Sequence, residues 1–230
     1  MEDLKERKDM VAMTFENNEI FDVEGLCNVF RYLRHFDKLE SLNFRCNKNF
    51  DEKIVAALAE GITLKKELRT VDLGENNITD AGIELLGEAL KTHVRLHMLF
   101  LDSNSITDKG SEGLSECLKN KQDLRVFNID NNRIGRQGAI KLATQLTTNY
   151  GLSKLYCDSN NIGEEGAEAI AECMEMMDSL KKICMENNGI KDRGCIALAK
   201  ALEENDTLLS LYLENNQITQ VGAREIGSIL

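Results

Sequence analysis

The chain has 230 residues, no proline and a formal net charge of −11 at pH 7. This excess of acidic residues argues against nucleic acid or an anionic membrane as the main partner, because both are negatively charged. No apolar run approaches the ~18 residues of a membrane span, and the charged start Met1–Met10 lacks the apolar segment of a secretory signal.

One unit of sequence repeats along almost the whole chain. After a charged lead-in at residues 1–9, we predict a degenerate unit at 10–38 and a second unit at 39–67. Leucines spaced 28 residues apart then open six regular units, at 68–95, 96–123, 124–151, 152–179, 180–207 and 208–230. A fixed period of this length is typical of a solenoid. Because no linker interrupts the units, we expect residues 10–230 to form one repeat domain.

The two first units match the pattern less well than the others. In 10–38 the strand and turn positions are filled by Met10, Met13, Phe15, Asn18 and Ile20, and the helix positions by Gly25, Val29 and Leu33. In 39–67 the same positions hold Leu39, Leu42, Phe44, Asn47, Phe50 and Ile54. Terminal units of a solenoid are expected to depart from the consensus because one face has no neighbour.

Each regular unit starts with the pattern L-x-x-L-x-L-x-x-N-x-I. In 68–95, Leu68, Val71 and Leu73 predict a short strand with alternate side chains in a core. Asn76 follows where the strand must turn away, and Ile78 is expected to fill the corner. The strand is therefore predicted to end at a turn that an asparagine holds.

A helix is predicted to complete each unit. Thr79 or Asp80 is expected to cap the helix of 68–95, whose inward face is formed by Gly82, Leu86, Ala89 and Leu90. The glycine recurs as Gly110, Gly138, Gly166, Gly194 and Gly222. A side chain at this position is expected to hold the helix off its neighbour. Strands pack closer together than helices, so the stack should curve with the strands inside.

The turn asparagine recurs in every unit after the first, at Asn47, Asn76, Asn104, Asn132, Asn160, Asn188 and Asn216. A carboxamide both donates and accepts hydrogen bonds, so these side chains are predicted to form a ladder along the stack. We expect the loss of Asn132 to destabilise the fold more than the loss of Asn216, because the last unit has only one neighbour.

The seven cysteines follow the repeat rather than a disulfide or zinc pattern. Four of them, Cys117, Cys157, Cys173 and Cys195, occupy core positions of the unit, whereas Cys184 lies on the exposed side of a strand and is expected to react fastest with thiol reagents. Buried free thiols favour a reducing compartment, so we expect a cytoplasmic protein.

The last unit stops without a polar cap. Gly222, Ile226, Ile229 and Leu230 complete one inward helix face, and no further unit follows in the sequence. Solenoids need polar terminal units for solubility. Two interpretations remain open: the chain is a fragment of a longer array, or another surface covers this end, for example in an end-to-end contact.

The extended pattern L-x-x-L-x-L-x-x-N-x-I-x-x-x-G, in units of 28 residues over Met10–Leu230, resembles the ribonuclease-inhibitor-like class of leucine-rich repeats. Asparagine in every turn is most similar to the repeat regions of NOD-like receptors and of the Ran GTPase-activating protein. Ribonuclease inhibitor itself departs from this chain, since it alternates 28 and 29 residues and often has cysteine at the turn. The resemblance implies an α/β fold, a right-handed horseshoe with parallel strands on the concave face and helices on the convex face, that binds proteins.

The sequence contains no recognisable catalytic motif. His35, His93 and His97 share no spacing, and P-loop, nucleophile-elbow and Cys/His patterns are missing. The glycines follow the repeat period, so they are expected to be structural. We therefore predict no catalytic residues, no cofactor and no metal site.

The solvent-facing strand positions carry the candidate site. The position after the third core residue is acidic in five successive units, at Asp102, Asp130, Asp158, Glu186 and Glu214, after Glu16, Arg45 and Gly74 in the first three. Aromatic residues stand beside it in every second unit, at Phe100, Tyr156 and Tyr212, with Asn128 and Cys184 between them. Like charges on adjacent strands cost stability, and exposed aromatic residues resemble binding hot spots.

Two interpretations of the acidic positions stay open. The carboxylates either face solvent and bind a basic partner, or they accept backbone N–H bonds near the turn, with Lys154 and Lys182 softening the repulsion. The leading hypothesis is a non-catalytic module that binds a basic, partly apolar protein surface through Phe100–Glu214. The alternatives are a GTPase activator resembling the Ran regulator and a ligand-sensing fragment of a NOD-like receptor.

Overall fold

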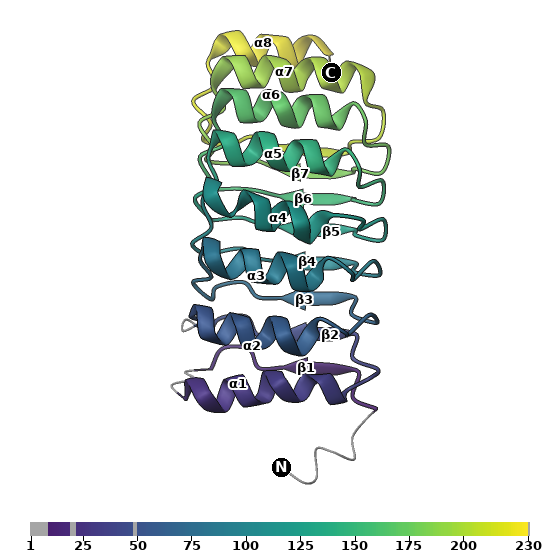
Figure 1. Ribbon diagram of the computed structural model, residues 1–230. Helices are drawn as coiled ribbons and strands as arrows, with labels where there is room; N and C mark the ends of the chain where they lie inside the picture. The colour runs from purple at the N-terminus through teal and green to yellow at the C-terminus, as the bar shows by residue number, and fades with distance from the viewer. Residues whose placement is uncertain (1–8, 19–21, 48–49, 230) are drawn as a thin grey trace.

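The strands form one open parallel sheet that is covered on one side by helices (Figure 1). The computed structural model describes residues 9–18, 22–47 and 50–229. Its sheet has eight strands in sequence order, each hydrogen-bonded to the next. Each strand has three residues and lies in register with its neighbour, as in the pairing of Val126 with Lys154. The predicted α/β solenoid, with strands on the concave face and helices on the convex face, is confirmed.

Strands and helices alternate along the chain. The strands are β1 (Ala12–Thr14), β2 (Ser41–Asn43), β3 (Thr70–Asp72), β4 (Met98–Phe100), β5 (Val126–Asn128), β6 (Lys154–Tyr156), β7 (Lys182–Cys184) and β8 (Ser210–Tyr212). The α-helices are α1 (Val23–Tyr32), α2 (Glu52–Ile62), α3 (Asp80–Leu90), α4 (Ser111–Leu118), α5 (Arg136–Leu146), α6 (Gly163–Met174), α7 (Lys191–Glu204) and α8 (Gln220–Ile229). Two short 3-10 turns, η1 (Leu33–His35) and η2 (Asp108–Gly110), complete the list.

The core lies between the sheet and the helices and runs along the stack. In the unit that starts at Leu68, the strand residues Val71 and Leu73 and the corner residue Ile78 are fully buried. The predicted inward face of α3 is buried as well. The repeated glycine is needed because a Cβ at Gly166 would lie 2.7 Å from Ile162 and 2.9 Å from Ala139 of the preceding unit. The side-chain pattern of the unit is therefore confirmed.

The asparagine ladder is present, and its bonds run from side chain to backbone. The Nδ2 of Asn132 donates to Leu101 of the preceding unit at 3.0 Å and to Ile129 of its own turn at 3.1 Å. Its Oδ1 accepts the backbone N–H of Ile106, again in the preceding unit, at 3.1 Å. Each side chain therefore closes its own turn and ties it to the unit before it.

Because the ladder points backward, its last member is fully bonded. Asn216 donates to the carbonyl of Met185 at 2.7 Å and accepts the N–H of Asn188 at 2.7 Å. It makes three bonds to the preceding unit, one more than Asn132 does. The missing neighbour therefore removes no bond of the Asn216 side chain to the preceding unit, and the smaller loss of stability expected there from the sequence stays a prediction.

Asp22 and Asp51 cap their own helices, α1 and α2, whereas Asp80 and Asp192 at the starts of α3 and α7 bond the next unit. The Thr79 side chain makes no capping bond to α3, so the expected self-cap is wrong there. Instead, Asp80 accepts the backbone N–H and the hydroxyl of Thr107, both at 2.7 Å. Asp192 makes the same pair of bonds to Thr219, at 2.8 and 2.7 Å. These contacts tie successive helix starts together on the convex side.

A second buried polar column lies where each helix ends. Lys65 donates to the carbonyl of Arg34 at 2.7 Å, and Asn205 donates to Met174 at 2.8 Å. At the equivalent positions His93 and Lys121 are fully buried, and their side chains reach Ile62 and Lys91 of the preceding unit, at 2.9 and 3.4 Å. These four side chains bond carbonyl groups where the previous helix ends, so His93 has a structural role. At the two remaining equivalent positions, Met177 is apolar and the buried amide of Asn149 has no hydrogen-bond partner among the described residues.

The first unit stacks on the second through β1, which pairs with β2 from Ala12 to Thr14. The predicted corner residue Ile20, the last residue Leu230 and most of the lead-in at 1–9 lie outside the described residues. At the other end of the stack, Leu211 and Leu213 are only partly buried, and α8 has a single buried residue, Gly222. The core is therefore least complete beside β8.

Candidate interaction surface on the concave face

Three parallel rows of side chains cross the strands on the concave face. We call Phe100, Asn128, Tyr156, Cys184 and Tyr212 the aromatic row, and these residues are successive partners in the sheet register. Two residues further along the sequence of each unit lies the acidic row, Asp102, Asp130, Asp158, Glu186 and Glu214. At the first strand position lies the basic row, in which Lys154 and Lys182 are partners in the register, and Arg125 and Lys181 stand one residue before β5 and β7. The sheet therefore brings all eight predicted partner-binding residues to one face.

The aromatic row is partly exposed and encloses a lysine. Phe100 and Tyr156 are half-buried, and Tyr212 is 37% exposed. The Nζ of Lys182 lies 5.1 Å from the ring centre of Tyr156 and 4.6 Å from that of Tyr212. Cys184 between the two rings is small and only 5% exposed, which leaves room for the lysine. The two tyrosines and the lysine thus form one amphipathic cluster with cation–π contacts.

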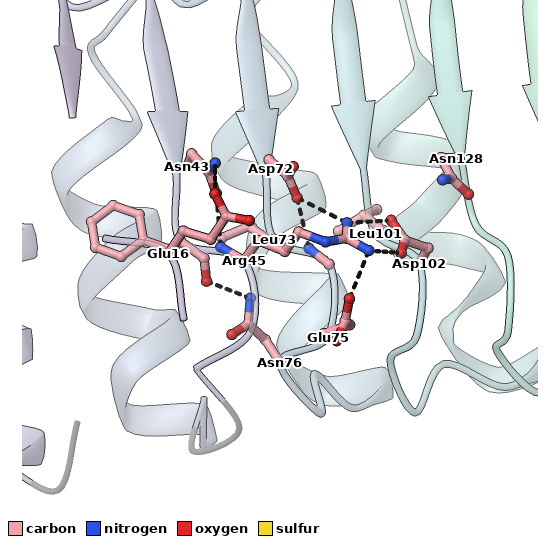
Figure 2. A network of polar contacts seen from close by, with 12 residues as sticks. Glu16, Asn43, Arg45, Asp72, Leu73, Glu75, Asn76, Leu101, Asp102 and Asn128 are labelled. Atoms are coloured by element: carbon pink, nitrogen blue, oxygen red, sulfur yellow. Dashed lines mark hydrogen bonds and ion pairs between the residues drawn. The ribbon is translucent and has the colours of Figure 1, made fainter. Parts of the chain in front are cut away.

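The first carboxylate of the acidic row is already paired within the chain (Figure 2). The guanidinium of Arg45 donates to Asp102 through Nη1 at 3.0 Å and to Glu75 through Nη2 at 2.9 Å. Arg45 reaches across Gly74, where a Cβ would lie 2.9 Å from both its Cζ and the Oδ1 of Asp102. The bond to Asp102 raises the pKa of Arg45. Glycine at this position of the row therefore makes space for an ion pair that spans three units.

The next two carboxylates accept backbone bonds. The Oδ1 of Asp130 accepts the N–H of Asp158 at 2.6 Å, and the Oδ1 of Asp158 accepts the N–H of Glu186 at 2.6 Å. Burial raises the pKa of Asp130 to about 7, and the negative charges of Asp158 and Asp102 add to this effect. Burial also raises the pKa of Asp158. Of the two interpretations left open for the acidic positions, Asp130 and Asp158 follow the one in which the carboxylate accepts a backbone N–H bond, and both side chains are half-buried rather than free in solvent.

The last two carboxylates are the least engaged. Among the described residues, neither Glu186 nor Glu214 forms an ion pair with a lysine or arginine, and Glu214 is exposed. Desolvation, followed by the charges of Asp158 and Glu214, raises the pKa of Glu186. The uncompensated negative charge of the row is therefore concentrated between β7 and β8.

The basic row was only partly foreseen from sequence. Lys154 and Lys182 were expected to soften the repulsion between carboxylates, whereas Arg125 and Lys181 went unnoticed. Lys154 and Arg125 are exposed, and Arg125 donates to the carbonyl of Gly151 at 2.9 Å. The sequence indicates these positions, because each of the four basic residues stands at the first position of a predicted strand or just before it. The concave face is thus basic at one edge and acidic at the other.

The cysteines are all free, and most of them are buried. Cys117, Cys157, Cys173 and Cys195 occupy the core as expected. Cys184 is also buried, and burial raises the pKa of its thiol to about 11. The expectation that it reacts fastest is therefore wrong. The most exposed of the seven thiols is that of Cys46, which is partly exposed at a turn.

One further surface bears on function. A hollow of about 250 Å³ at the β8 end is lined by apolar side chains, among them Leu202, Leu208, Leu209 and Leu211. The predicted end-to-end contact through this region stays a prediction. No helix in the described parts of the chain is both long and apolar enough to cross a lipid bilayer.

Comparison with known proteins identifies the repeat. The family model "Leucine Rich repeat" matches residues 67–87, 120–143, 158–171 and 204–227. No curated protein matches the chain. Among solved structures, internalin C2 from Listeria monocytogenes is similar with a TM-score of 0.64 and 21% sequence identity, over 91% of this chain and 74% of that one. This likeness shows the fold alone.

Two other solved structures are similar over most of their length. The actin-binding site 2 of leiomodin-1 has 14% sequence identity and a TM-score of 0.36, over 92% of this chain and 88% of that one. The C-terminal domain of Caenorhabditis elegans tropomodulin has 16% sequence identity and a TM-score of 0.37, over 91% of both chains. The repeat matches, the eight-stranded open parallel sheet and the outer helices agree: the chain has the fold of a leucine-rich repeat solenoid.

Proposed function

We propose that this protein is a non-catalytic interaction module that binds a protein through its concave face between Phe100 and Glu214. The observation that carries the proposal is the aromatic row, since Tyr212 is 37% exposed on a sheet face where a polar residue would suffice. Tyrosine buries a large area at low entropic cost and is enriched at binding hot spots. Its neighbours Phe100 and Tyr156 extend the same strip across the strands.

The charge of the face supports a basic patch on the partner. Among the described residues, Glu186 and Glu214 form no ion pair with a lysine or arginine, and the charge of Lys182 acts on Glu186 less than desolvation and the charges of Asp158 and Glu214 do. A basic group of the partner would meet them beside Tyr212. Charge complementarity of this kind accelerates association and fixes the binding register. We infer that the partner places lysine or arginine against the β7–β8 end of the acidic row.

The same proposal includes a reducing compartment, and we place the protein in the cytoplasm. All seven cysteines are free, and six of them are buried in the fold. Buried thiols that act as small apolar side chains are typical of proteins from reducing compartments. The 28-residue spacing with asparagine at every turn supports the ribonuclease-inhibitor-like class of repeats.

Site-specific photo-cross-linking tests the proposal. A photoreactive phenylalanine analogue would replace Tyr212 on the concave face and, in a matched control, Leu85 on the convex helix α3, which is 40% exposed. We expect the Tyr212 variant to capture a protein from native extract that the Leu85 variant does not capture.

Binding of the captured protein is then measured after its purification. We expect the double substitution Tyr156→Ala and Tyr212→Ala to weaken the affinity at least ~10-fold, as the loss of hot-spot side chains does, whereas Leu85→Ala leaves it unchanged. Two results would show that the concave face is not the binding site: capture of a protein by the Leu85 variant alone, or an unchanged affinity after the double substitution Tyr156→Ala and Tyr212→Ala.

A further inference from the structure

The distance between the basic row and the acidic row limits the width of a partner segment that binds over the aromatic row. Lys154 and Asp158 are four residues apart in the sequence of one unit, and so are Lys182 and Glu186 in the next unit. At ~3.3 Å per residue of strand, the backbones of the basic and acidic rows are separated by roughly 13 Å, and the Nζ of Lys182 lies within this width, over the rings of Tyr156 and Tyr212. The aromatic row lies between them. An α-helix with its side chains is about 10–12 Å across, so one helix would fill this width with a charged row on either flank.

The backbone of the sheet favours a helix over an extended segment. Each strand from β4 to β7 is paired on both sides in the sheet, and the edge strand β8 is paired with β7. The face therefore offers side chains rather than free N–H and C=O groups. An extended segment laid on the aromatic row would leave its own backbone groups facing apolar rings, which is costly. A helix satisfies its backbone internally and can present side chains alone.

The spacing of the units also matches a helix that runs across the strands. Neighbouring strands are ~4.8 Å apart, and one helical turn rises ~5.4 Å. Phe100, Tyr156 and Tyr212 lie on every second strand, at β4, β6 and β8, so they are roughly 10 Å apart. Two helical turns, or seven residues, rise about 10.5 Å. Apolar residues spaced by seven on one helix would therefore meet the three rings in turn.

We propose that the concave face from β4 to β8 holds an amphipathic α-helix of the partner, laid across the strands between the two charged rows. Its apolar stripe packs on Phe100, Tyr156 and Tyr212. Basic residues on one flank face Glu186 and Glu214, and acidic residues on the other flank face the basic row. This inference rests on the proposed function and specifies the shape and chemistry of the partner.

The first test uses three synthetic peptides of three heptads each. The first has an apolar stripe with lysines on one flank and glutamates on the other; the second has lysines on both flanks; the third is the first with two central prolines, which break a helix. We expect the first peptide to bind the full chain at least ~10-fold more tightly than either control, and to lose ~10-fold in affinity for the Tyr156→Ser, Tyr212→Ser variant. Equal binding of the proline peptide, or no binding of the first, would overturn the helix.

The second test measures the conformation of the bound segment. Photoreactive analogues at Phe100 and at Tyr212, four strands apart, would be cross-linked separately to the first peptide and to the captured partner. The span of ~19 Å corresponds to about 13 residues of helix at ~1.5 Å each, and to about six residues of extended chain. Cross-links about 13 residues apart support the helix.

The outcomes separate the two proposals. Cross-links about six residues apart, or on discontinuous segments of the partner, would refute the helix and leave the concave interaction surface in place. Failure of the Tyr212 position to capture any protein that the Leu85 control does not capture would refute the proposed function, and the helix with it.

Discussion

Replacing Lys121 by methionine should stabilise the protein at neutral pH. Lys121 is fully buried, and its Nζ contacts only the carbonyls of Lys91 at 3.4 Å and Lys119 at 3.1 Å. Burial lowers its pKa from 10.5 to about 8. At ~1.4 kcal/mol per pH unit, the buried ammonium costs the folded state on the order of 3 kcal/mol at pH 7. Methionine is compatible with the position, since the equivalent Met177 two units later is 2% exposed.

The net gain is smaller than the electrostatic cost, because the variant loses two hydrogen bonds. At roughly 1 kcal/mol for the lost bonds, Lys121→Met should raise the free energy of unfolding by about 2 kcal/mol at pH 7. Between the folded pKa near 8 and the unfolded value near 10.5, the unfolded state binds more protons. The stability of the wild-type protein therefore rises with pH through this window. The advantage of the variant should shrink by most of its value between pH 7 and pH 10.

Urea unfolding of both proteins at pH 7 and pH 10 measures the difference directly. The matched control is Lys119→Met, whose side chain is 46% exposed, and which should show no comparable gain at pH 7. A Lys121→Met protein that is less stable than the wild type at pH 7, or whose advantage does not change with pH, would contradict this account of the buried ammonium.

Three further outcomes follow from the structure. Asn132→Leu and Asn216→Leu should each lower the free energy of unfolding by roughly 1–3 kcal/mol in urea titrations, because both amides are fully bonded to the preceding unit; a much smaller loss at Asn216 would contradict the backward ladder. In native-state alkylation followed by mass spectrometry, Cys46 should react first and Cys184 slowly. Asp130→Asn keeps an oxygen that accepts the N–H of Asp158. Because burial raises the pKa of Asp130 to about 7, the folded wild type carries a costly buried carboxylate at pH 8 but not at pH 4.5, so the substitution should stabilise the fold more at pH 8.

The repeat made the fold predictable from sequence to a large extent. Leucine spacing alone places the strands and the core, because a side chain that alternates in or out of a sheet does so in every unit. The turn asparagines were predictable for the same reason, since a turn without Asn132 would leave buried N–H and C=O groups unpaired. What the period could not show was direction: whether a side chain such as Asp80 bonds its own unit or the next one.

The concave site was less predictable, because side chains from several units combine there. Arg45 and Asp102 are 57 residues apart in sequence, and they meet only because Gly74 between them has no side chain. A column of residue types does not reveal such a contact, since the length and direction of each side chain decide it. The eight partner-binding residues themselves stay a prediction.

The structure also changes where the acidic row should be tested. Adjacent like charges ~5 Å apart are destabilising, and the chain offsets this cost in three different ways: Arg45 pairs with Asp102, backbone N–H groups bond Asp130 and Asp158, and the raised pKa of Asp130 lowers its charge at neutral pH. Reversing Asp130 and Asp158 to lysine would therefore mix loss of fold with loss of binding. Among the described residues, Glu186 and Glu214 form no ion pair and accept no backbone N–H bond with their carboxylates. Reversing this pair should therefore weaken the partner's affinity, most strongly at low salt, while the free energy of unfolding stays within about 0.5 kcal/mol of the wild type. A large loss of stability would instead assign these two carboxylates to the scaffold.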